Sequence, residues 1–169
     1  MTRRKLLSTL AAAVGAGTLG RWRGAQAAGR GLGTLELPAE YWRDKVAPAA
    51  WAVLFEEDTE PAFSSPLNAE KRSGTYVCAA CHLPLFSSTT KFDSGTGWPS
   101  FWASLPEAIG TRRDFKLIVP RIEYHCRRCG GHQGHVFDDG PPPTGLRYCN
   151  NGLALRFAPA GEPLPALRP

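Results

Sequence analysis

The stretch Ile122-Glu123-Tyr124-His125-Cys126-Arg127-Arg128-Cys129 decides the fold of this chain. Its first five residues favour a strand because they are rich in β-branched and aromatic side chains, and they run straight into a Cys-x-x-Cys pair. A similar run, Thr75-Tyr76-Val77, precedes a second pair, Cys78-Ala79-Ala80-Cys81. A spacing of two residues lets one tight turn offer both sulfurs to a single ion. The pattern therefore predicts β structure with metal-binding turns beside the strands.

The two pairs together supply the ligands of a structural zinc site. Zinc in such sites prefers a tetrahedron of ligands, and four thiolates leave no open position for a water molecule. The metal would therefore hold the fold and take no part in the chemistry. The 44 residues between the pairs exceed the spacing of a compact zinc ribbon, so we expect an insertion between the turns. We expect one zinc ion per chain, bound by Cys78, Cys81, Cys126 and Cys129.

Two other uses of these cysteines stay open at the level of the sequence. Exported proteins form disulfides, but a bridge within one pair closes a loop too small to stabilise the chain much. Cross-pairing between the two turns is the form of this alternative that remains. A redox-active Cys-x-x-Cys is the other, and the lack of a thioredoxin-like βαβ pattern argues against it.

The rest of the sequence predicts one mostly antiparallel β domain with short N-terminal helices. Residues 37–46 favour a short helix with Pro38 near its start, and apolar spacing over residues 51–55 indicates a second. Residues 153–157 alternate between large apolar side chains and Ala or Arg, as in a strand with one buried face. Other runs that favour strands are residues 75–77, 115–119, 122–126 and 147–149.

Composition limits the classes of protein to which the chain can belong. With 169 residues and 43% hydrophobic residues, the chain can bury the core of one domain. The formal net charge of +5 comes from residues 1–27, which carry five basic residues and no acidic ones. The remainder has no net charge, and a neutral body lacks the electrostatic footprint of a nucleic-acid binder. We expect no nucleic-acid partner and a monomeric protein.

Residues 1–27 are predicted to be a cleavable export signal. A basic start precedes an apolar run over residues 6–19 that is too short and too rich in Gly and Ala to span a bilayer, and Ala25-Gln26-Ala27 forms a cleavage site. Arg3 and Arg4 followed by Lys-Leu-Leu resemble a twin-arginine signal, which predicts export of the folded protein, with its metal already bound, to a bacterial periplasm. A Sec signal or an uncleaved anchor are the alternatives. The expected divisions after it are a flexible tail at residues 28–35, a folded domain at 36–158 and a C-terminal tail at 159–169.

The fifth cysteine, Cys149, has no place in the two pairs. A leftover cysteine in an exported protein is a free thiol or an intermolecular partner, and a buried core residue is the plainer alternative. Cys149 follows Arg147 in a polar stretch, and a nearby cation lowers the pKa of a thiol. Upstream stand His132 and His135, and histidines beside a reactive cysteine donate protons or orient a substrate. We therefore expect Cys149 to be a reactive thiolate.

Several long motifs in this order resemble the methionine-R-sulfoxide reductase family, MsrB. They stand at residues 91–101 (KFDSGTGWPSF), 131–141 (GHQGHVFDDGP) and 147–151 (RYCNN), together with both Cys-x-x-Cys pairs and a similar opening motif at 59–63 (TEPAF). The resemblance runs from Glu60 to Phe157. It implies a catalytic domain that reduces methionine-R-sulfoxide, and a fold that is a distorted antiparallel β-barrel of two sheets with a four-cysteine zinc site.

The resemblance also implies roles for the site residues, and their chemistry suits those roles. Cys149 would attack the sulfoxide sulfur and become a sulfenic acid, which a second thiol must reduce. The implied partners are proteins that contain methionine-R-sulfoxide and a thioredoxin-like reductant, and after cleavage the chain would have no stable membrane span. The resemblance places His132, His135 and Asn151 around the sulfoxide oxygen, Trp98 against the substrate methyl group and Arg147 beside the thiol.

The chain departs from the family pattern at two positions. Thr96 stands where many relatives carry a cysteine that resolves the sulfenic acid as a disulfide. With four cysteines on zinc, regeneration would then need direct attack by an external thiol, or a borrowed zinc cysteine. Gln133 stands where relatives usually have an apolar Leu. Two functional alternatives remain at this point: a non-enzymatic zinc-knuckle binding module, and a reductase for free methionine-R-sulfoxide only.

Overall fold

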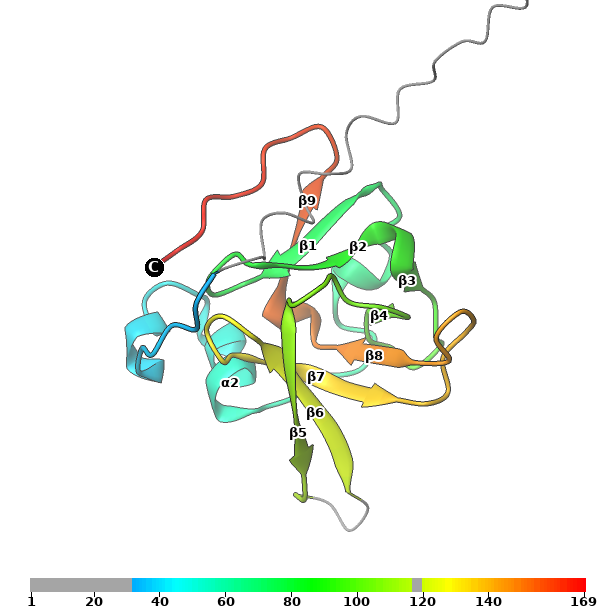
Figure 1. The fold of residues 1–169 in the computed structure, drawn as a ribbon, viewed down its shortest axis with the longest axis horizontal. Coiled ribbons are helices and arrows are strands. Elements are labelled where there is room, and N and C mark those ends of the chain that lie inside the picture. Colours follow the sequence, from blue (N-terminus) through cyan, green and yellow to red (C-terminus); the bar gives the residue numbers. More distant parts are fainter. Residues whose placement is uncertain (1–31, 117–119) are drawn as a thin grey trace, which may run out of the picture.

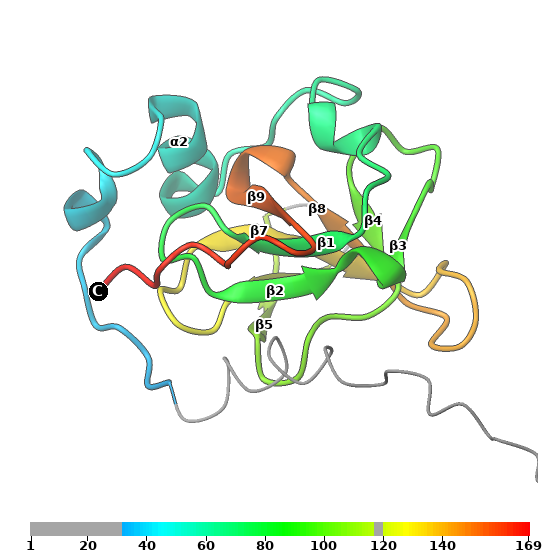
Figure 2. The same ribbon diagram turned by 90° about the horizontal axis from the view of Figure 1, so that it is seen from above.

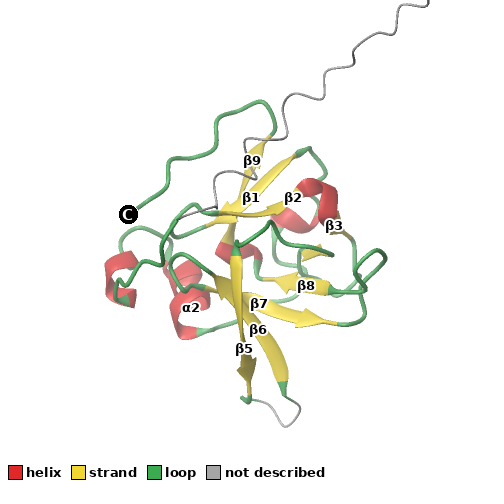
Figure 3. Ribbon diagram, viewed as in Figure 1, coloured by secondary structure: helices red, strands yellow, loops and turns green. Residues whose placement is uncertain are grey.

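The computed structural model describes residues 32–116 and 120–169, which form two antiparallel sheets with a helix beside them (Figure 1 and Figure 3). In the small sheet, β1 (Gly74–Cys78) lies between β2 (Pro84–Ser87) and β9 (Leu155–Pro159). The strand order of the large sheet is β3-β4-β8-β7-β6-β5. Its strands are β3 (Lys91–Phe92), β4 (Ser100–Phe101), β5 (Ile109–Asp114), β6 (Arg121–Cys126), β7 (His132–Phe137) and β8 (Arg147–Asn150).

The two sheets confirm the predicted mostly β class, but they do not close into the implied barrel. Within the described residues, β2 and β9 are the edges of the small sheet, and β3 and β5 are the edges of the large one. Closure requires every edge strand to pair with another strand. Here β9 pairs with β1 alone and β5 with β6 alone, so the architecture is two packed sheets with four free edges.

Figure 2 shows the strands of the small sheet beside those of the large sheet. Aromatic side chains of both sheets pack together in the core. Phe86 of β2 stacks on Phe101 of β4 with ring centroids 4.3 Å apart, and Tyr76 of β1 meets the same ring edge-on at 4.9 Å. Tyr124 of β6 and Tyr148 of β8 complete the cluster from the large sheet. Since the apolar residues of β6 and β8 face this core, their polar alternates must project from the opposite face of the large sheet.

Of the two predicted helices, one is longer and the other shorter than the sequence indicates. The predicted helix at residues 51–55 is confirmed as α2 (Pro48–Glu56), which begins at a proline and ends at Glu57 in the left-handed conformation. The predicted helix over 37–46 is wrong in extent, because only the single turn η1 (Ala39–Trp42) forms. The residue before a proline avoids helical geometry, and Ala47 is extended accordingly. Three further short turns are η2 (Pro66–Asn68), η3 (Ser88–Thr90) and η4 (Gly152–Ala154).

The strand predictions are correct for β1, β6 and β8 and need correction elsewhere. The strand expected at 115–119 is wrong for its first two residues. Phe115 and Lys116 follow the end of β5, and Phe115 is 67% exposed. Residues 117–119 lie outside the described residues. Leu153 lies in η4 and is exposed, while Ala154 is buried, so the predicted alternation holds only from Leu155 onward. The apolar pattern of the sequence did not predict β5 and β7, because many of the residues in these two strands are polar.

Segments near both ends of the described chain contact the metal-binding turns, although their composition indicates loose tails. The backbone N–H of Leu35 donates to the carbonyl of Arg128 at 2.6 Å, and that of Arg168 donates to the carbonyl of Cys81 at 3.1 Å. Turn carbonyls without a strand partner need such donors, so both segments are held against the body. The predicted signal, residues 1–27, lies outside the described residues. None of the helices in the described part of the chain is long and apolar enough to cross a membrane.

Candidate active site and metal centre

The four paired cysteines meet in one buried cluster beside the ends of β1 and β6. Their four Sγ atoms lie within 4.8 Å of one another, with 3.7 Å between those of Cys78 and Cys129 and 3.5 Å between those of Cys81 and Cys126. Zinc–sulfur bonds of about 2.3 Å in a tetrahedron put sulfurs about 3.8 Å apart, whereas a disulfide bond measures about 2.05 Å. The cluster therefore fits the predicted structural zinc ion and is not a pair of disulfides.

The cluster needs a cation to hold all four sulfurs as thiolates. Hydrogen bonds with the neighbouring thiols raise the pKa of Cys78, and burial raises that of Cys126. Four thiolates confined to one buried site repel one another, and a bound metal removes this penalty because it deprotonates the thiols that it binds. Zinc would here supply folding free energy, and its four protein ligands leave it no position for a substrate.

Cys149 lies in the middle of a row of side chains that crosses the large sheet. It stands opposite His135 of β7 on one side and opposite Ser100 of β4 on the other. His135 in turn stands opposite Glu123 of β6. Residues directly opposite in an antiparallel sheet project from the same face, with Cβ atoms about 4.5–5.5 Å apart. The strand register therefore brings the predicted nucleophile and a predicted proton donor side by side.

The electrostatics of Cys149 differ from the sequence-based expectation. We expected Arg147 to lower the pKa of the thiol, but burial raises it, and the Arg147 charge only partly offsets that effect. The guanidinium of Arg147 donates two hydrogen bonds, both of 2.8 Å, to the carboxylate of Asp139, and the Asp139 charge adds to the upward shift. A hydrogen bond with the Thr96 side chain also favours the thiolate. In the resting protein Cys149 is therefore a thiol that substrate binding must help to ionise.

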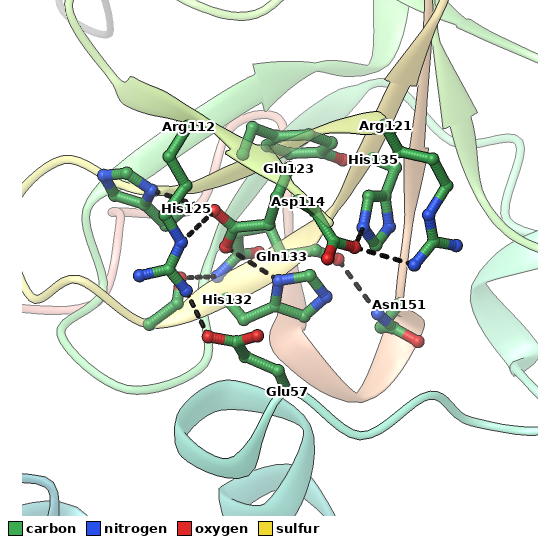
Figure 4. Close-up of polar contacts among 12 residues, drawn as sticks. Glu57, Arg112, Asp114, Arg121, Glu123, His125, His132, Gln133, His135 and Asn151 are labelled. Atoms are coloured by element: carbon green, nitrogen blue, oxygen red, sulfur yellow. Dashed lines mark hydrogen bonds and ion pairs between the residues drawn. The ribbon is translucent and has the colours of Figure 1, made fainter. Parts of the chain in front are cut away.

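The two predicted histidines are each held by a carboxylate (Figure 4). His132 Nδ1 lies 2.8 Å from Glu123 Oε1, and His135 Nε2 lies 2.7 Å from Asp114 Oδ2. His132 and Glu123 are both buried, at 2% and 1% exposure. The two rings meet edge to face with centroids 5.4 Å apart. The two imidazoles thus form one compact group beside Cys149.

Trp98 and Asn151 are brought together by Glu60, a residue for which the sequence suggested no role. The indole N–H of Trp98 donates to the Glu60 carbonyl at 3.0 Å, and the Glu60 N–H donates to Asn151 Oδ1 at 3.1 Å. The buried Glu60 carboxylate accepts hydrogen bonds from the N–H groups of Gly152 and Leu153. Burial raises the pKa of this carboxyl, and those two N–H groups oppose the shift. Glu60 therefore fixes the loop that carries Asn151.

Gln133 connects the metal centre to the same loop. Its side chain is fully buried, and its Nε2 lies 3.7 Å from Cys78 Sγ. Its backbone carbonyl accepts from the Asn151 N–H at 2.8 Å and from Asn151 Nδ2 at 3.2 Å. The side-chain Oε1 has no hydrogen-bond partner among the described residues. A buried polar atom without a hydrogen-bond partner lowers the stability of the folded protein. Glutamine in place of an apolar residue at position 133 therefore costs stability.

Glu123 and Asp114 are functional candidates that lie outside the sequence motifs. A signal for Glu123 exists in the sequence of β6, where Arg121, Glu123 and His125 alternate with apolar residues. Such alternation puts the charged residues on the face away from the core, which is the face of Cys149. No comparable signal marks Asp114, because its role depends on the pairing of β5 with β6.

This fold and site define a class of protein: a zinc-stabilised β domain with a fifth cysteine that lies apart from the metal cluster and opposite a carboxylate-bound histidine. A family model described as the SelR domain matches residues 46–159. A protein named peptide methionine sulfoxide reductase MsrB from Pseudomonas putida is 50% identical over 121 residues, covering 71% of this chain and 91% of the relative. Proteins of the same name from Thiobacillus denitrificans (50% identical, 70% and 90% covered) and Leifsonia xyli (46%, 80% and 99%) are similar. The chain belongs to the SelR family, that of the MsrB reductases.

Proposed function

We propose that the protein is a peptide-methionine (R)-S-oxide reductase whose nucleophile is Cys149. The observation that carries the proposal is the register of β7 against β8, which sets the Cys149 thiol directly opposite His135. A nucleophile beside an acid–base group is the arrangement that nucleophilic catalysis requires. The curated relatives carry the name of this activity.

The reaction divides into two balanced steps. In the first, the Cys149 sulfur forms a bond with the sulfoxide sulfur while the sulfoxide oxygen takes up protons and leaves as water. A water molecule then attacks the Cys149 sulfur, the sulfur–sulfur bond breaks, the thioether leaves and Cys149 becomes a sulfenic acid. The sulfoxide oxygen leaves its sulfur only when it carries a proton or strong hydrogen bonds, which His132 and His135 are placed to supply. In the second step, two external thiols reduce the sulfenic acid to the Cys149 thiol, releasing water and a disulfide.

Trp98 is proposed to select the R epimer by shape. Its ring is half-buried and its indole nitrogen is fixed to Glu60, so the ring forms a rigid wall. A methyl group against this wall and an oxygen toward the histidines leave one arrangement of substituents at sulfur. The S epimer would have to exchange two of these positions.

The external reductant is proposed to be a thioredoxin-like dithiol, acting outside the cytoplasm. Thr96 rather than a cysteine contacts Cys149, which supports direct attack by the donor on the Cys149 sulfenic acid. The twin-arginine-like sequence of residues 1–27 supports export to a bacterial periplasm. Cell fractionation of the full chain and of the double variant Arg3→Lys, Arg4→Lys tests this location. The twin-arginine route predicts that the full chain reaches the periplasm and that the double variant stays in the cytoplasm.

Incubation of zinc-loaded protein with separate R and S sulfoxides of a dabsyl-methionine peptide and dithiothreitol tests the function. We expect turnover of the R epimer alone, and none by Cys149→Ser. The Cys149→Ser variant should bind zinc and unfold like the wild type, so that its inactivity reports on the thiol. Turnover of both epimers at similar rates, or activity without Cys149, would contradict the proposal.

A further inference from the structure

The β5–β6 hairpin brings two ion pairs to the face of Cys149. Arg112 stands opposite Glu123, and Asp114 stands opposite Arg121. Both pairs are in contact: Arg112 Nε lies 2.8 Å from Glu123 Oε2, and Arg121 donates to Asp114 Oδ2 at 2.8 Å. Each carboxylate is therefore fixed by an arginine of the neighbouring strand, and each also makes a short contact with a histidine of β7 (Figure 4).

The carboxylates contact different nitrogens of the two imidazole rings. Glu123 binds Nδ1 of His132, whereas Asp114 binds Nε2 of His135. Among the described residues, no hydrogen-bond partner is found for the other nitrogen of either ring, Nε2 of His132 and Nδ1 of His135. These are the nitrogens that can reach a substrate or a water molecule.

Both carboxylates are ionised at neutral pH and can only accept hydrogen bonds. Burial raises the pKa of Glu123, but hydrogen bonds from His125 and His132 and the charge of Arg112 bring it to about 2. The backbone N–H of Lys116 and the His135 ring lower the pKa of Asp114. A carboxylate that cannot donate requires the proton on the nitrogen that it contacts. That requirement fixes the tautomer of each neutral ring.

We propose that Glu123 and Asp114 are positioning residues that lock the two catalytic histidines in opposite tautomers, Nδ1–H for His132 and Nε2–H for His135. This inference rests on the proposed function. The lock gives the site two unlike free nitrogens, His132 Nε2 and His135 Nδ1, on rings that cannot flip without losing a charge-assisted hydrogen bond. A ring held in this way presents the same nitrogen to the sulfoxide oxygen in every turnover. That nitrogen donates a proton only when the ring has taken up a second one, and after the transfer the neutral ring keeps its N–H on the carboxylate.

A purely structural role for Glu123 is the competing explanation, and Glu57 provides the comparison. Arg112 also pairs with Glu57, whose side chain is 30% exposed and, within the described part of the chain, makes no hydrogen bond or ion pair with a histidine. Arg112 thus already has a carboxylate partner at the surface. A second carboxylate that is only 1% exposed, Glu123, is not needed to neutralise the arginine. Burying a charge is costly unless it makes further contacts. The further contacts of Glu123 are His132 and His125.

The first test is the tautomeric state of the rings in the zinc-loaded, reduced protein. The chain has four histidines, so two-dimensional long-range proton–nitrogen NMR of histidine-labelled protein gives four ring patterns, assigned with His132→Gln and His135→Gln. We expect Nδ1–H for His132 and Nε2–H for His135 at pH 8. In Glu123→Gln, His132 should show the Nε2–H form or a mixture. Nε2–H for His132 in the wild type would overturn the inference.

The second test is kinetic and uses matched variants. Glu123→Gln and Asp114→Asn should each lower kcat about 10-fold or more while KM changes less than about 2-fold, because the substrate still binds but the proton is misplaced. Glu57→Gln, which removes the same charge from beside Arg112, should stay within about 2-fold of wild type. Adding Glu123→Gln to His132→Gln should cause no further loss, since coupled residues are not additive. A full multiplicative loss in the double variant would overturn the positioning role.

The outcomes also separate this inference from the proposed function. The NMR measurement needs no substrate, so the tautomers decide the inference even if Glu123→Gln does not fold. If the wild type reduces neither epimer, the proposed function fails whatever the tautomers are. If the wild type reduces the R epimer but its histidines share one tautomer, the inference alone fails.

Discussion

Asp139 holds the guanidinium of Arg147, the cation beside Cys149 in the sequence, through two hydrogen bonds of 2.8 Å. The ring of Phe137 lies under the same guanidinium, 4.3 Å from the Arg147 Cζ atom. The arginine is thereby fixed in place. Burial raises the pKa of the Cys149 thiol, the Arg147 charge opposes this shift, and the Asp139 carboxylate adds to it.

Replacing Asp139 by Asn should therefore make Cys149 more reactive at neutral pH. The Asp139 carboxylate itself raises the pKa of Cys149 and the Arg147 charge lowers it, so removing the carboxylate shifts the thiol toward thiolate on both counts. Alkylation by iodoacetamide at pH 7.5 should be a few-fold faster in Asp139→Asn than in the wild type. The alkylation rate of the wild type should still be rising at pH 9. The Cys149→Ser variant measures the background alkylation of the zinc cysteines. A slower Asp139→Asn would show that the pair acts by orienting Arg147.

The metal centre makes a second prediction, on the coupling of zinc to folding. Purified protein should contain about one zinc per chain, and Cys126→Ser should lose both the metal and the folded state, because binding and folding free energy are shared in a closed thiolate site. Cys149→Ser is the matched control, since it removes the one cysteine outside the cluster. Metal analysis and circular dichroism of the three proteins decide the question. Folded Cys126→Ser without zinc would contradict it.

A third prediction concerns Gln133, which the metal centre and the Asn151 loop share. Gln133→Leu removes a buried Oε1 that has no partner in the described structure and gives up only a long contact with Cys78 Sγ. The two side chains have similar volumes, so the core should accept the change. We expect the free energy of unfolding in urea to rise by about 1 kcal/mol, with zinc content unchanged.

Loss of zinc affinity in Gln133→Leu would show instead that the amide N–H stabilises the Cys78 thiolate. Gln133→Glu separates the two effects. It keeps the size of the side chain but places a charge beside the thiolates, and it should destabilise the protein in either case.

The sequence predicted the metal centre because it is encoded locally, and it singled out Cys149 as the one cysteine outside the two pairs. Each Cys-x-x-Cys turn positions two sulfurs by itself, and the aromatic strands beside the turns bring the pairs together. The sequence identified the two histidines as site residues but did not predict their positions relative to Cys149. Their relation to Cys149 depends on the register of β7 against β8, and spacing along the chain does not set this register.

What could not be predicted depends on contacts between distant segments. Glu60 reaches Asn151 across 91 residues of chain, and the closure of a barrel depends on whether edge strands meet. The wrong strand at residues 115–119 has a local cause: its apolar residues indicate β structure, but the pairing of β5 ends at Asp114, opposite Arg121. The raised pKa of Cys149 was missed because burial is its largest cause, and the sequence shows Arg147 beside the thiol but does not show how far the thiol is buried.

The last prediction is that Cys149 is recycled without an internal disulfide. The Thr96 side chain, which carries no thiol, favours the Cys149 thiolate, and its hydroxyl belongs to a network with Ser94 and Ser100 in which neighbouring oxygens lie 2.8 Å apart. A sulfenic acid on Cys149 should therefore persist after one turnover without reductant. Excess sulfoxide should consume one thiol per chain, leave zinc bound, and allow dimedone to label Cys149.

Thr96→Cys provides the matched variant, because it places a second thiol where the hydroxyl now contacts Cys149. The sulfenic acid of this variant should condense with the introduced thiol to a disulfide, with loss of water, so that dimedone labelling falls and two thiols are consumed per turnover. Mass spectrometry of the oxidised proteins distinguishes the two states, with a gain of one oxygen in the wild type and a loss of two hydrogens in the variant. The opposite result is a wild-type peptide that links Cys149 to one of the four zinc cysteines, accompanied by release of zinc. That result would make the metal centre part of the redox cycle.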